Sequence, residues 1–340
     1  MRVFVYEYCS GGGANAGAAC AAELLDAGRA MRDALVADLA DVPGLALTAA
    51  CRDEAEAGLL RSRCAGAVRW VWPRPGEDAA GFVHRHAARH AQAWIVAPET
   101  DGVLMRLAAA VEAPRWIGCT RDALHLASRK RATIARLAAH GLVTPLAFDG
   151  EARRWVVKPD DGAGCVATVV HLGHAAARAD LHERRARGES ATLEPWIDGQ
   201  AISISLLCGP GGAELLGIHH QSIAVLPEAE GRVRLRDDGV AIDREPRVGE
   251  RAEALRRVGR AVGAAVPGLR GFVGIDLVWH AARGPAVIEV NPRLTCAFVG
   301  LSAALGRPLA REILQAQLAQ QAALAAARPA PRQEALLAAS

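Results

Sequence analysis

Short apolar runs alternate with Ala-rich helical segments in the first third of the chain, and this alternation constrains the fold more than any other feature. Residues 2–8 form the first apolar run, which leads into a glycine turn and then into helical periodicity over residues 14–39. Later strands are expected at 45–50, 67–72 and 93–97, with helices at 81–91 and after a capping Asp101. Strands and helices that alternate in this way form parallel βαβ units. We therefore expect residues 1–118 to be a Rossmann-like parallel α/β domain.

The pattern changes after residue 120, where β-type runs begin to dominate. Helices are expected over residues 121–140 and near 251–262. The expected strands cover residues 144–148, 153–158, 166–171, 191–197, 201–208, 214–225, 271–280 and 286–290. This α+β region is divided into a small lobe at 119–188 and a carboxy-terminal lobe at 189–320. The Ala- and Pro-rich residues 321–340 are expected to be a partly disordered tail.

Composition excludes several classes of function. Charges of both signs are mixed along the chain and the net charge is +3, so no nucleic-acid surface is indicated. No apolar stretch approaches the ~18 residues of a membrane span, and Glu7 interrupts a run too short for a signal peptide. Eight cysteines without a C-x-x-C pair favour reduced thiols. These features predict a cytoplasmic protein that acts on small molecules.

The glycine turn has the G-x-G-x-x-A spacing of a dinucleotide fingerprint, from Gly11 to Ala16. Such a fingerprint needs an acidic residue about 20 residues further on, at the end of the second strand. Here the first acid after that strand is Asp53, far beyond the required spacing. An NAD(P) site is therefore disfavoured. The backbone amides beside a helix start suit a substrate carboxylate instead, and a plain tight turn is the alternative; the residues concerned are Glu7, Ser10, Gly11, Gly12 and Gly13.

Lysine is rare in the chain, since Lys130 and Lys158 are the only two among 40 basic residues. An ammonium is a compact charge suited to phosphate, whereas Arg supplies nearly all the other cations. Lys158 ends an apolar run and precedes a loop that contains Gly162 and Gly164. Glycines let backbone amides approach a phosphate closely, so the segment is interpreted as a phosphate site. A hairpin turn of the same composition is the alternative.

Two late strands carry hard oxygen ligands. Asp276 lies in an apolar run, and Glu289 and Asn291 stand two apart in the next strand, so they share a face. If the strands pair, two carboxylates and an amide oxygen meet, as suits Mg²⁺ shared with substrate phosphates. Arg293 follows and can hold phosphate through two parallel hydrogen bonds. A surface hairpin with solvated acids is the alternative, but it explains an acid in an apolar run poorly.

Residues 193–199 form one further candidate segment. It joins the end of a strand to a Pro and a Gly and contains Glu194, Ile197 and Asp198. Glu194 and the backbone of Ile197 could face the edge of an adenine, and a simple linker between strands explains the segment equally well.

Taken in order, these segments resemble the ATP-grasp superfamily from about residue 115 to residue 309. The resemblance implies an ATP-grasp fold with a preceding α/β domain, a nucleotide lid in the small lobe and a Mg²⁺ site in the carboxy-terminal lobe. It assigns Lys130 and Lys158 to the phosphates of ATP and residues 160–165, with Gly162 and Gly164, to the flexible loop above them. The remaining assignments are Glu194 and Ile197 for adenine, Asp276, Glu289 and Asn291 for Mg²⁺ (which Mn²⁺ can replace), and Arg293 for a phosphoryl group.

The chain departs from the superfamily pattern at one position. Many members place a Glu for the ribose hydroxyls two residues after the hinge glycine, where this chain has Ala201. The alternatives for that contact are Asp198, Gln200 or a water molecule that holds the ribose.

Three short strings narrow the resemblance to the tyramine–glutamate ligase group of methanofuran biosynthesis. They lie at residues 4–13, 97–104 and 289–295. The implied reaction joins L-glutamate to tyramine or a tyrosine-like amine through an acyl phosphate, with ADP and phosphate as products. Arg293 and Lys158 are then the catalytic residues. The candidate substrate contacts beyond the glycine turn are Glu99, Asp101, His220, Gln221 and Thr295.

Two other functions stay open from the sequence. One is an ATP-grasp ligase for a different acid and amine, and the other is a nucleotide-binding protein without turnover. Dimers are common in the superfamily, so a homodimer is an expectation.

Overall fold

The amino-terminal domain is built on a five-stranded parallel sheet in the computed structural model, which describes residues 1–13, 22–63, 68–228 and 232–326. The strands are β1 (Arg2–Glu7), β2 (Ala46–Ala50), β3 (Val68–Val71), β4 (Gln92–Val96) and β5 (Trp116–Ile117). Their order is β3-β2-β1-β4-β5, and all neighbours are parallel. This order is typical of doubly wound α/β folds, so the expected Rossmann-like domain is confirmed.

Helices cover both faces of this sheet. Val3 and Val5 of β1 pack in one apolar cluster with α1 and α2, whereas Phe4 and Tyr6 pack in another with α3 and α4. The four helices are α1 (Ala22–Ala40), α2 (Glu54–Arg63), α3 (Ala79–Ala87) and α4 (Val103–Ala109). A strand that is buried on both faces has a continuous apolar run, as β1 has.

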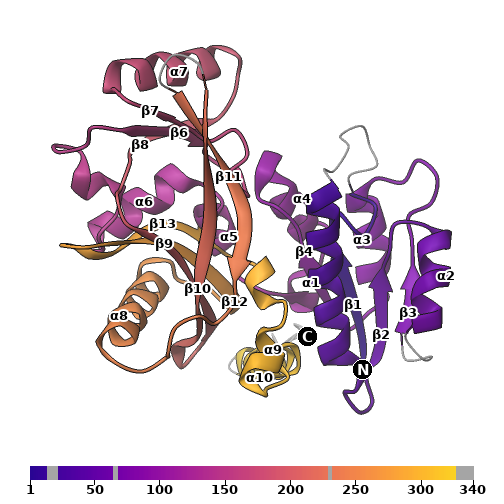
Figure 1. Cartoon of the computed structure of the whole chain (residues 1–340). Helices are drawn as coiled ribbons and strands as arrows, with labels where there is room; N and C mark the ends of the chain where they lie inside the picture. The colour runs from indigo at the N-terminus through magenta and orange to yellow at the C-terminus, as the bar shows by residue number, and fades with distance from the viewer. Residues whose placement is uncertain (14–21, 64–67, 229–231, 327–340) are drawn as a thin grey trace, which may run out of the picture.

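The second part of the chain forms an antiparallel sheet of eight strands in the order β13-β12-β9-β10-β11-β7-β6-β8. The strands are β6 (Trp155–Pro159), β7 (Val169–His171), β8 (Ala191–Pro195), β9 (Gln200–Gly209), β10 (Gly212–Pro227), β11 (Arg232–Ala241), β12 (Gly271–His280) and β13 (Gly284–Asn291). The helices are α5 (Arg121–Ala127), α6 (Lys130–Ala139), α7 (His174–Ala186) and α8 (Glu250–Ala265). The long strands β10 and β11 join the small lobe of β6, β7, β8 and α7 to the rest of the sheet (Figure 1).

The chain returns to the amino-terminal domain through two helices, α9 (Leu301–Leu305) and α10 (Leu309–Ala326). Leu314 of α10 lies in the same apolar cluster as Val5 of β1. Asp38 on α1 accepts hydrogen bonds from the hydroxyl of Ser302 at 2.6 Å and from the amide of Ala310 at 3.0 Å. The two domains therefore share a core and are tied together by hydrogen bonds.

The helix expected over residues 121–140 is wrong in one respect, because the chain breaks it into α5 and α6. Arg129 has extended backbone angles (φ −121°, ψ 100°), and α6 begins at Lys130. The carboxylate of Asp160 caps the new helix by accepting a hydrogen bond from the amide of Arg131 at 2.7 Å. The break places Lys130 at a helix start and not in the middle of a helix.

Two other expectations fail. Residues 144–148 form a 3₁₀ turn (Pro145–Phe148) in place of a strand, because Pro145 occupies its first position. Asp101 does not cap α4, since Gly102 is its N-cap residue and Asp101 has a left-handed φ of 53°. Five further elements were not expected from the sequence: helices α2, α7 and α9 and strands β5 and β11.

Some expectations fall outside the described residues. These are the start of the first helix at residues 14–21, the first residue of the third strand and the tail at 327–340. Within the part of the chain that the structure describes, no helix is both long and apolar enough to cross a membrane.

Candidate functional site

A cavity of about 390 Å³ lies between the small lobe (β6, β7, β8 and α7) and the rest of the antiparallel sheet. The start of α6, the glycine loop and strands from β6 to β13 supply its walls. Five charged residues that the sequence assigned to ATP and Mg²⁺ line it together: Lys130, Lys158, Glu194, Asp276 and Glu289. Ile197 and Gly162 also line it. The structure thus brings together residues that are up to 159 positions apart in the chain (Lys130 to Glu289).

Lys130 is buried at the start of α6 and faces β13, the strand that carries the expected Mg²⁺ ligands Glu289 and Asn291. Its Nζ lies 2.9 Å from Oε1 of Glu289 and donates a hydrogen bond to the carbonyl oxygen of Gly162. Burial works to lower the pKa of Lys130, but the carboxylate of Glu289, with smaller effects of Glu99 and Glu194, raises it above the ordinary value. Lys130 is therefore a buried permanent cation at the edge of the cavity.

Lys158 forms the second buried ion pair of the cavity. Its Nζ lies 2.7 Å from Oε2 of Glu194, and both side chains are less than a tenth exposed. The antiparallel pairing of β6 with β8 places Val156 opposite Glu194, two residues before Lys158. The other oxygen of Glu194, Oε1, is buried without a hydrogen-bond partner among the described residues. A buried unpartnered acceptor is unfavourable, so this atom is suited to a donor from a ligand.

The glycine loop crosses the cavity between β6 and β7. Gly164 has a φ of 63°, and two non-glycine residues, Cys165 and Ala167, also have positive φ values of 57° and 53°. Non-glycine residues in this region carry conformational strain, which often occurs at ligand-binding segments. Gly162 packs so closely on Pro159 that a Cβ at Gly162 would lie 2.9 Å from the Cβ of Pro159.

The expected hairpin of β12 and β13 is confirmed, and its register places Asp276 directly opposite Glu289. Asp276 accepts hydrogen bonds from the amide nitrogen of Gln221 at 2.9 Å and from that of Asn291 at 3.1 Å. Burial, followed by the neighbouring carboxylate of Glu289, raises the pKa of Asp276 to about 7. Two carboxylates held this close repel one another, which a bound cation would relieve.

The donor set fits Mg²⁺. Two carboxylates and an amide oxygen form a hard, all-oxygen set of the kind that binds this ion together with phosphates. Within the described residues, no three side chains of His, Cys, Asp or Glu are grouped to hold a metal ion without further ligands. The site therefore depends on Asp276, Glu289, Asn291 and oxygens from a ligand or water.

Arg293 pairs with a residue of the other domain. Its Nε donates to Oε1 of Glu99 at 2.9 Å and its Nη2 donates to Oε2 at 2.8 Å. Glu99 is 3% exposed and follows β4 in the amino-terminal domain. Both oxygens of Glu99 thus bind Arg293, and the role of Glu99 as a substrate contact stays a prediction.

The glycine turn uses its amides within the chain. Gly11 donates to the carbonyl of Glu7 at 2.7 Å, Gly13 donates to the carbonyl of Tyr8 at 2.9 Å, and the amide of Ser10 donates to the carboxylate of Glu7 at 2.7 Å. Burial raises the pKa of Glu7 despite these hydrogen bonds. The amides of Ser10, Gly11 and Gly13 are thus engaged, and Gly12 has a φ of 84°. The geometry favours the tight-turn alternative over a substrate-carboxylate site.

Three other candidates lie away from the cavity. Asp198 is 76% exposed and pairs with Arg154, and its role as a ribose contact stays a prediction. His220 points to the other face of β10, where Nε2 lies 2.8 Å from Oε1 of Glu245; only its neighbour Gln221 faces the cavity. Asp101 is exposed, with its carbonyl bound by Arg106.

Thr295 lies beside the site without lining the cavity. It precedes the 3₁₀ turn Cys296–Phe298, and its methyl group lies 2.9 Å from where a Cβ on Gly274 would be. Its role as a substrate contact stays a prediction.

The apolar part of the cavity wall was not predicted from the sequence. Val156, Ile223, Val225, Leu235 and Ile288 line the cavity. Leu235 belongs to β11, which the analysis did not assign. The alternating string R-V-R-L-R at residues 232–236 was the available signal for this strand.

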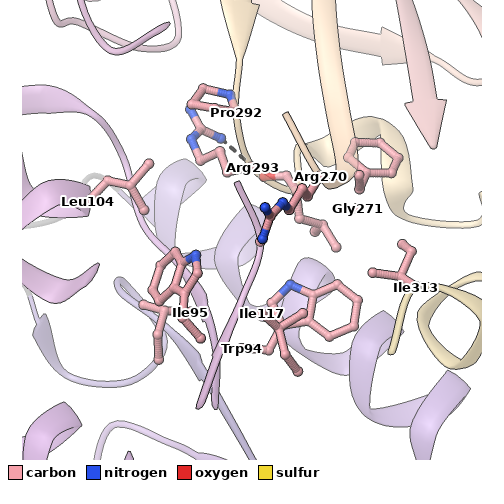
Figure 2. Close-up of a pocket in the computed structure, with 13 residues that line it drawn as sticks. Trp94, Ile95, Leu104, Ile117, Arg270, Gly271, Pro292, Arg293 and Ile313 are labelled. Carbon is pink, nitrogen blue, oxygen red and sulfur yellow. Dashed lines mark hydrogen bonds between the residues drawn. The ribbon is translucent and has the colours of Figure 1, made fainter. Parts of the chain in front are cut away.

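A second, much smaller cavity marks the seam between the domains. It has a volume of about 20 Å³, which is room for roughly one water molecule. Figure 2 shows Arg293 and Pro292 at one end, with Ile95 and Ile117 of the parallel sheet below and Ile313 of α10 to the side. It is too small for a substrate, so the larger cavity is the candidate site.

An antiparallel sheet, a glycine loop and a lysine-lined cavity between them define a nucleotide-binding class of protein. Residues 127–297 match the family described as the ATP-grasp domain, and residues 54–124 match the pre ATP-grasp 3 domain. The first match spans half of the chain. The protein therefore belongs to the ATP-grasp family, with a pre-ATP-grasp domain before it.

Solved structures share the fold at low sequence identity. An ATP-grasp superfamily protein from Archaeoglobus fulgidus has a TM-score of 0.63 and 19% identity, covering 93% of this chain and 88% of that chain. The L-amino acid ligase from Bacillus licheniformis has a TM-score of 0.61 and 17% identity, covering 93% and 74%. The D-alanine–D-alanine ligase from Bacillus anthracis has a TM-score of 0.61 and 14% identity, covering 95% and 99%. No curated protein sequence matches the chain.

Proposed function

We propose that this protein is an ATP- and Mg²⁺-dependent ligase that forms an amide bond between a carboxylic acid and an amine. One observation carries the proposal: both lysines of the chain and the paired strand acids converge on one cavity. The names of two of the similar structures, an L-amino acid ligase and a D-alanine–D-alanine ligase, support the same reaction class.

The two lysines would hold the phosphates of ATP. Lys130 and Lys158 are buried and already paired with carboxylates, so phosphate oxygens can replace Glu289 at Lys130 and bind Lys158 beside Glu194 without exposing either ammonium. Glu194 would keep Lys158 on one oxygen and offer Oε1 to an amino group such as that of adenine. Gly162 and Gly164 allow the loop backbone to lie close to the phosphates.

Asp276, Glu289 and Asn291 would hold Mg²⁺, which supplies charge neutralisation at the phosphates when it is bound. Mn²⁺ accepts the same oxygen ligands and is proposed as a substitute. Gln221 orients the carboxylate of Asp276 through its hydrogen bond. The protein then acts by positioning the acid for attack on the γ-phosphoryl group and by stabilising charge on the acyl phosphate, where Arg293 has its role.

For the substrates, we propose L-glutamate, acylated through its γ-carboxylate, and tyramine or a tyrosine-like amine, in the biosynthesis of a methanofuran-type cofactor. The support is the resemblance of three strings, which lie at the carboxyl ends of β1, β4 and β13. The second and third strings meet in the pair of Glu99 with Arg293. Glu7 of the first is near enough to Cys296 to add to the burial that raises the pKa of that thiol.

The test is to incubate the protein with ATP, Mg²⁺, L-glutamate and a panel of amines that includes tyramine and tyrosine. ADP and the mass of the product are measured, and the Asp276→Asn variant provides the blank. ADP and an amide product with tyramine support the whole proposal. Turnover with another pair only would keep the ligase and replace its substrates, and ADP no higher than the blank with every pair would overturn it in favour of nucleotide binding without turnover. Sedimentation of the same sample tests the proposed homodimer.

A further inference from the structure

Glu99 and Arg293 form a buried ion pair across the boundary between the two domains. Glu99 follows the carboxyl end of β4 in the parallel sheet, and Arg293 follows the carboxyl end of β13 in the antiparallel sheet. The carboxylate accepts two parallel hydrogen bonds, at 2.9 and 2.8 Å, and the side chains are 3% and 13% exposed. Parallel bonds of this kind fix the plane of a guanidinium as well as its position.

The hydrogen-bond pattern leaves one edge of Arg293 available. A guanidinium has five N–H groups. The Nε and Nη2 edge is used by Glu99, and Nη1 donates to the carbonyl of Leu294 at 3.2 Å (Figure 2). Among the described residues these bonds use three of the five donors, so one N–H on each terminal nitrogen can serve a ligand.

Arg293 is also close to the proposed metal carboxylates. Glu289 contributes, after Glu99, to raising the pKa of Arg293, although burial opposes the rise. Arg293 in turn counteracts part of the rise in the pKa of Asp276. Arg293 follows β13, the strand that carries Glu289, and its guanidinium binds Glu99 of the other domain.

We propose that Glu99 is a positioning residue, which holds Arg293 by one edge so that its remaining N–H groups face the oxyanion of the reacting acid. This inference rests on the proposed function. It assigns to the amino-terminal domain a direct part in building the catalytic site. It also explains why the carboxylate of Glu99 lies so close to Arg293, the residue proposed to bind an anion. The carboxylate orients the guanidinium and makes no contact with the reacting group.

The test combines Glu99→Gln, Glu99→Asp and Arg293→Lys with the double variant of Glu99→Gln and Arg293→Lys. Glu99→Gln loses one of two accepted bonds, and we expect kcat to fall by roughly 10- to 100-fold while the KM for ATP stays within about twofold. Glu99→Asp keeps the charge and should recover part of the loss. The double variant should be no slower than Arg293→Lys, because Glu99 acts only through Arg293. Glu112→Gln is the matched control, since Glu112 pairs with Arg115 on the surface of the same domain.

Two kinetic results would overturn the inference. A rise in the KM of the acid or amine with unchanged kcat would make Glu99 a substrate contact. Losses that add fully in the double variant would mean that Glu99 acts independently of Arg293.

An NMR measurement that needs no turnover tests this inference independently of the proposed function. The Nε–H signal of Arg293 in a nitrogen–proton NMR spectrum is assigned by its loss in Arg293→Lys. Slow solvent exchange of this signal in the wild type, and fast exchange in Glu99→Gln but not in Glu112→Gln, supports the positioning contact even if no substrate pair gives ADP. An exchange rate that Glu99→Gln leaves unchanged would overturn it even if the enzyme is an active ligase.

Discussion

At the scale of single residues, three buried cations each face one carboxylate: Lys130 faces Glu289 and Lys158 faces Glu194 at the cavity, and Arg293 faces Glu99 at the boundary between the domains. Buried charges of this kind need partners, because an unpaired one is costly. The three pairs satisfy these charges in the protein without ligands.

The lysine argument gives a direct prediction for Lys158→Arg. The larger guanidinium does not fit between Glu194 and the cavity, since Nζ of the lysine is already 2.7 Å from the carboxylate. We expect turnover to fall by at least about 100-fold although the charge is kept. Arg154→Lys is the control, because Arg154 pairs with the exposed Asp198 outside the cavity. The turnover of this variant should equal that of the wild type. A normal rate for Lys158→Arg would show that the lysine is not used as a point charge on phosphate.

Asp276 makes a prediction about stability against pH. Its pKa of about 7 lies above the ordinary carboxyl value, so the metal-free protein loses stability as pH rises from about 4 to about 7 and Asp276 ionises. Asp276→Asn removes this charge. The variant without metal should therefore melt a few degrees higher than the wild type at pH 8, with little difference at pH 5. Added Mg²⁺ should raise the melting temperature of the wild type but not that of the variant.

Asp180→Asn is the matched control for that experiment, with the opposite sign. Burial opposes the shift, but hydrogen bonds from His171 and Arg184 lower the pKa of Asp180. Removing its charge should lower the melting temperature at pH 8. If Asp276→Asn also melts lower than the wild type at pH 8, the two strand acids do not repel one another as described.

The residues at and before Ala201 predict that the protein discriminates weakly between nucleotides with different sugars. Ala201 lines the cavity where the superfamily often has Glu, and Asp198 is bound to Arg154 and to the indole N–H of Trp196 at 3.0 Å. Gln200 is bound to Arg251 at 2.7 Å. We expect 2′-deoxy-ATP to support turnover within about threefold of ATP, since a missing hydroxyl then leaves no protein partner unpaired. A preference for ATP above about 100-fold would reveal a ribose contact.

At the scale of elements, the glycine turn is explained by packing. A Cβ on Gly11 would lie 2.6 Å from the backbone oxygen of Glu7 and 2.6 Å from the ring of Tyr6, which is fully buried. Gly11→Ala should therefore lower the free energy of unfolding by about 1–3 kcal/mol. Gly58→Ala should raise it by about 0.5–1 kcal/mol, because Gly58 lies in α2 with nothing within 4 Å of its Cβ position. Urea unfolding measures both, and unchanged stability of Gly11→Ala with weaker substrate binding would restore the anion-site hypothesis.

The hairpin of β12 and β13 was predictable because the residue types and their spacing indicate the same structure there. An acid in an apolar run and the E-x-N spacing both indicate a one-sided strand, and the register then follows from pairing. Most of the five-stranded parallel sheet was predictable for a similar reason, since continuous apolar runs separated by helices have few other solutions.

Helix α7 could not be predicted from apolar periodicity, and β11 offered only the short alternating string at residues 232–236. Among the residues of α7, Ala177 and Arg184 alone are buried, and Leu235 is the one buried side chain of β11. Such elements are held by neighbours in the fold more than by their own pattern. The break of the helix at Arg129 has the same origin, because the capping carboxylate of Asp160 is 30 residues away in the chain from Lys130.

At the scale of the whole molecule, a buried ion pair joins the two domains. The pair of Glu99 and Arg293 could not be read from the sequence, because two segments on different sheets meet only after the domains dock. The shared core of β1 and α10 fixes that docking. The assignment of residues 1–118, 119–188, 189–320 and 321–340 to separate parts stays a prediction, and α10 shows that the carboxy-terminal lobe also covers the parallel sheet.

The central claim is that this cavity transfers a phosphoryl group from ATP to a carboxylate. The most direct measurement uses the acid substrate labelled with ¹⁸O in its carboxylate, together with ATP, Mg²⁺ and the amine, and follows the label into phosphate by mass spectrometry. An acyl phosphate predicts that one ¹⁸O atom appears in each phosphate released with ADP and product. Product formation with unlabelled phosphate would contradict the account, as would the absence of ADP formation with every acid and amine tested.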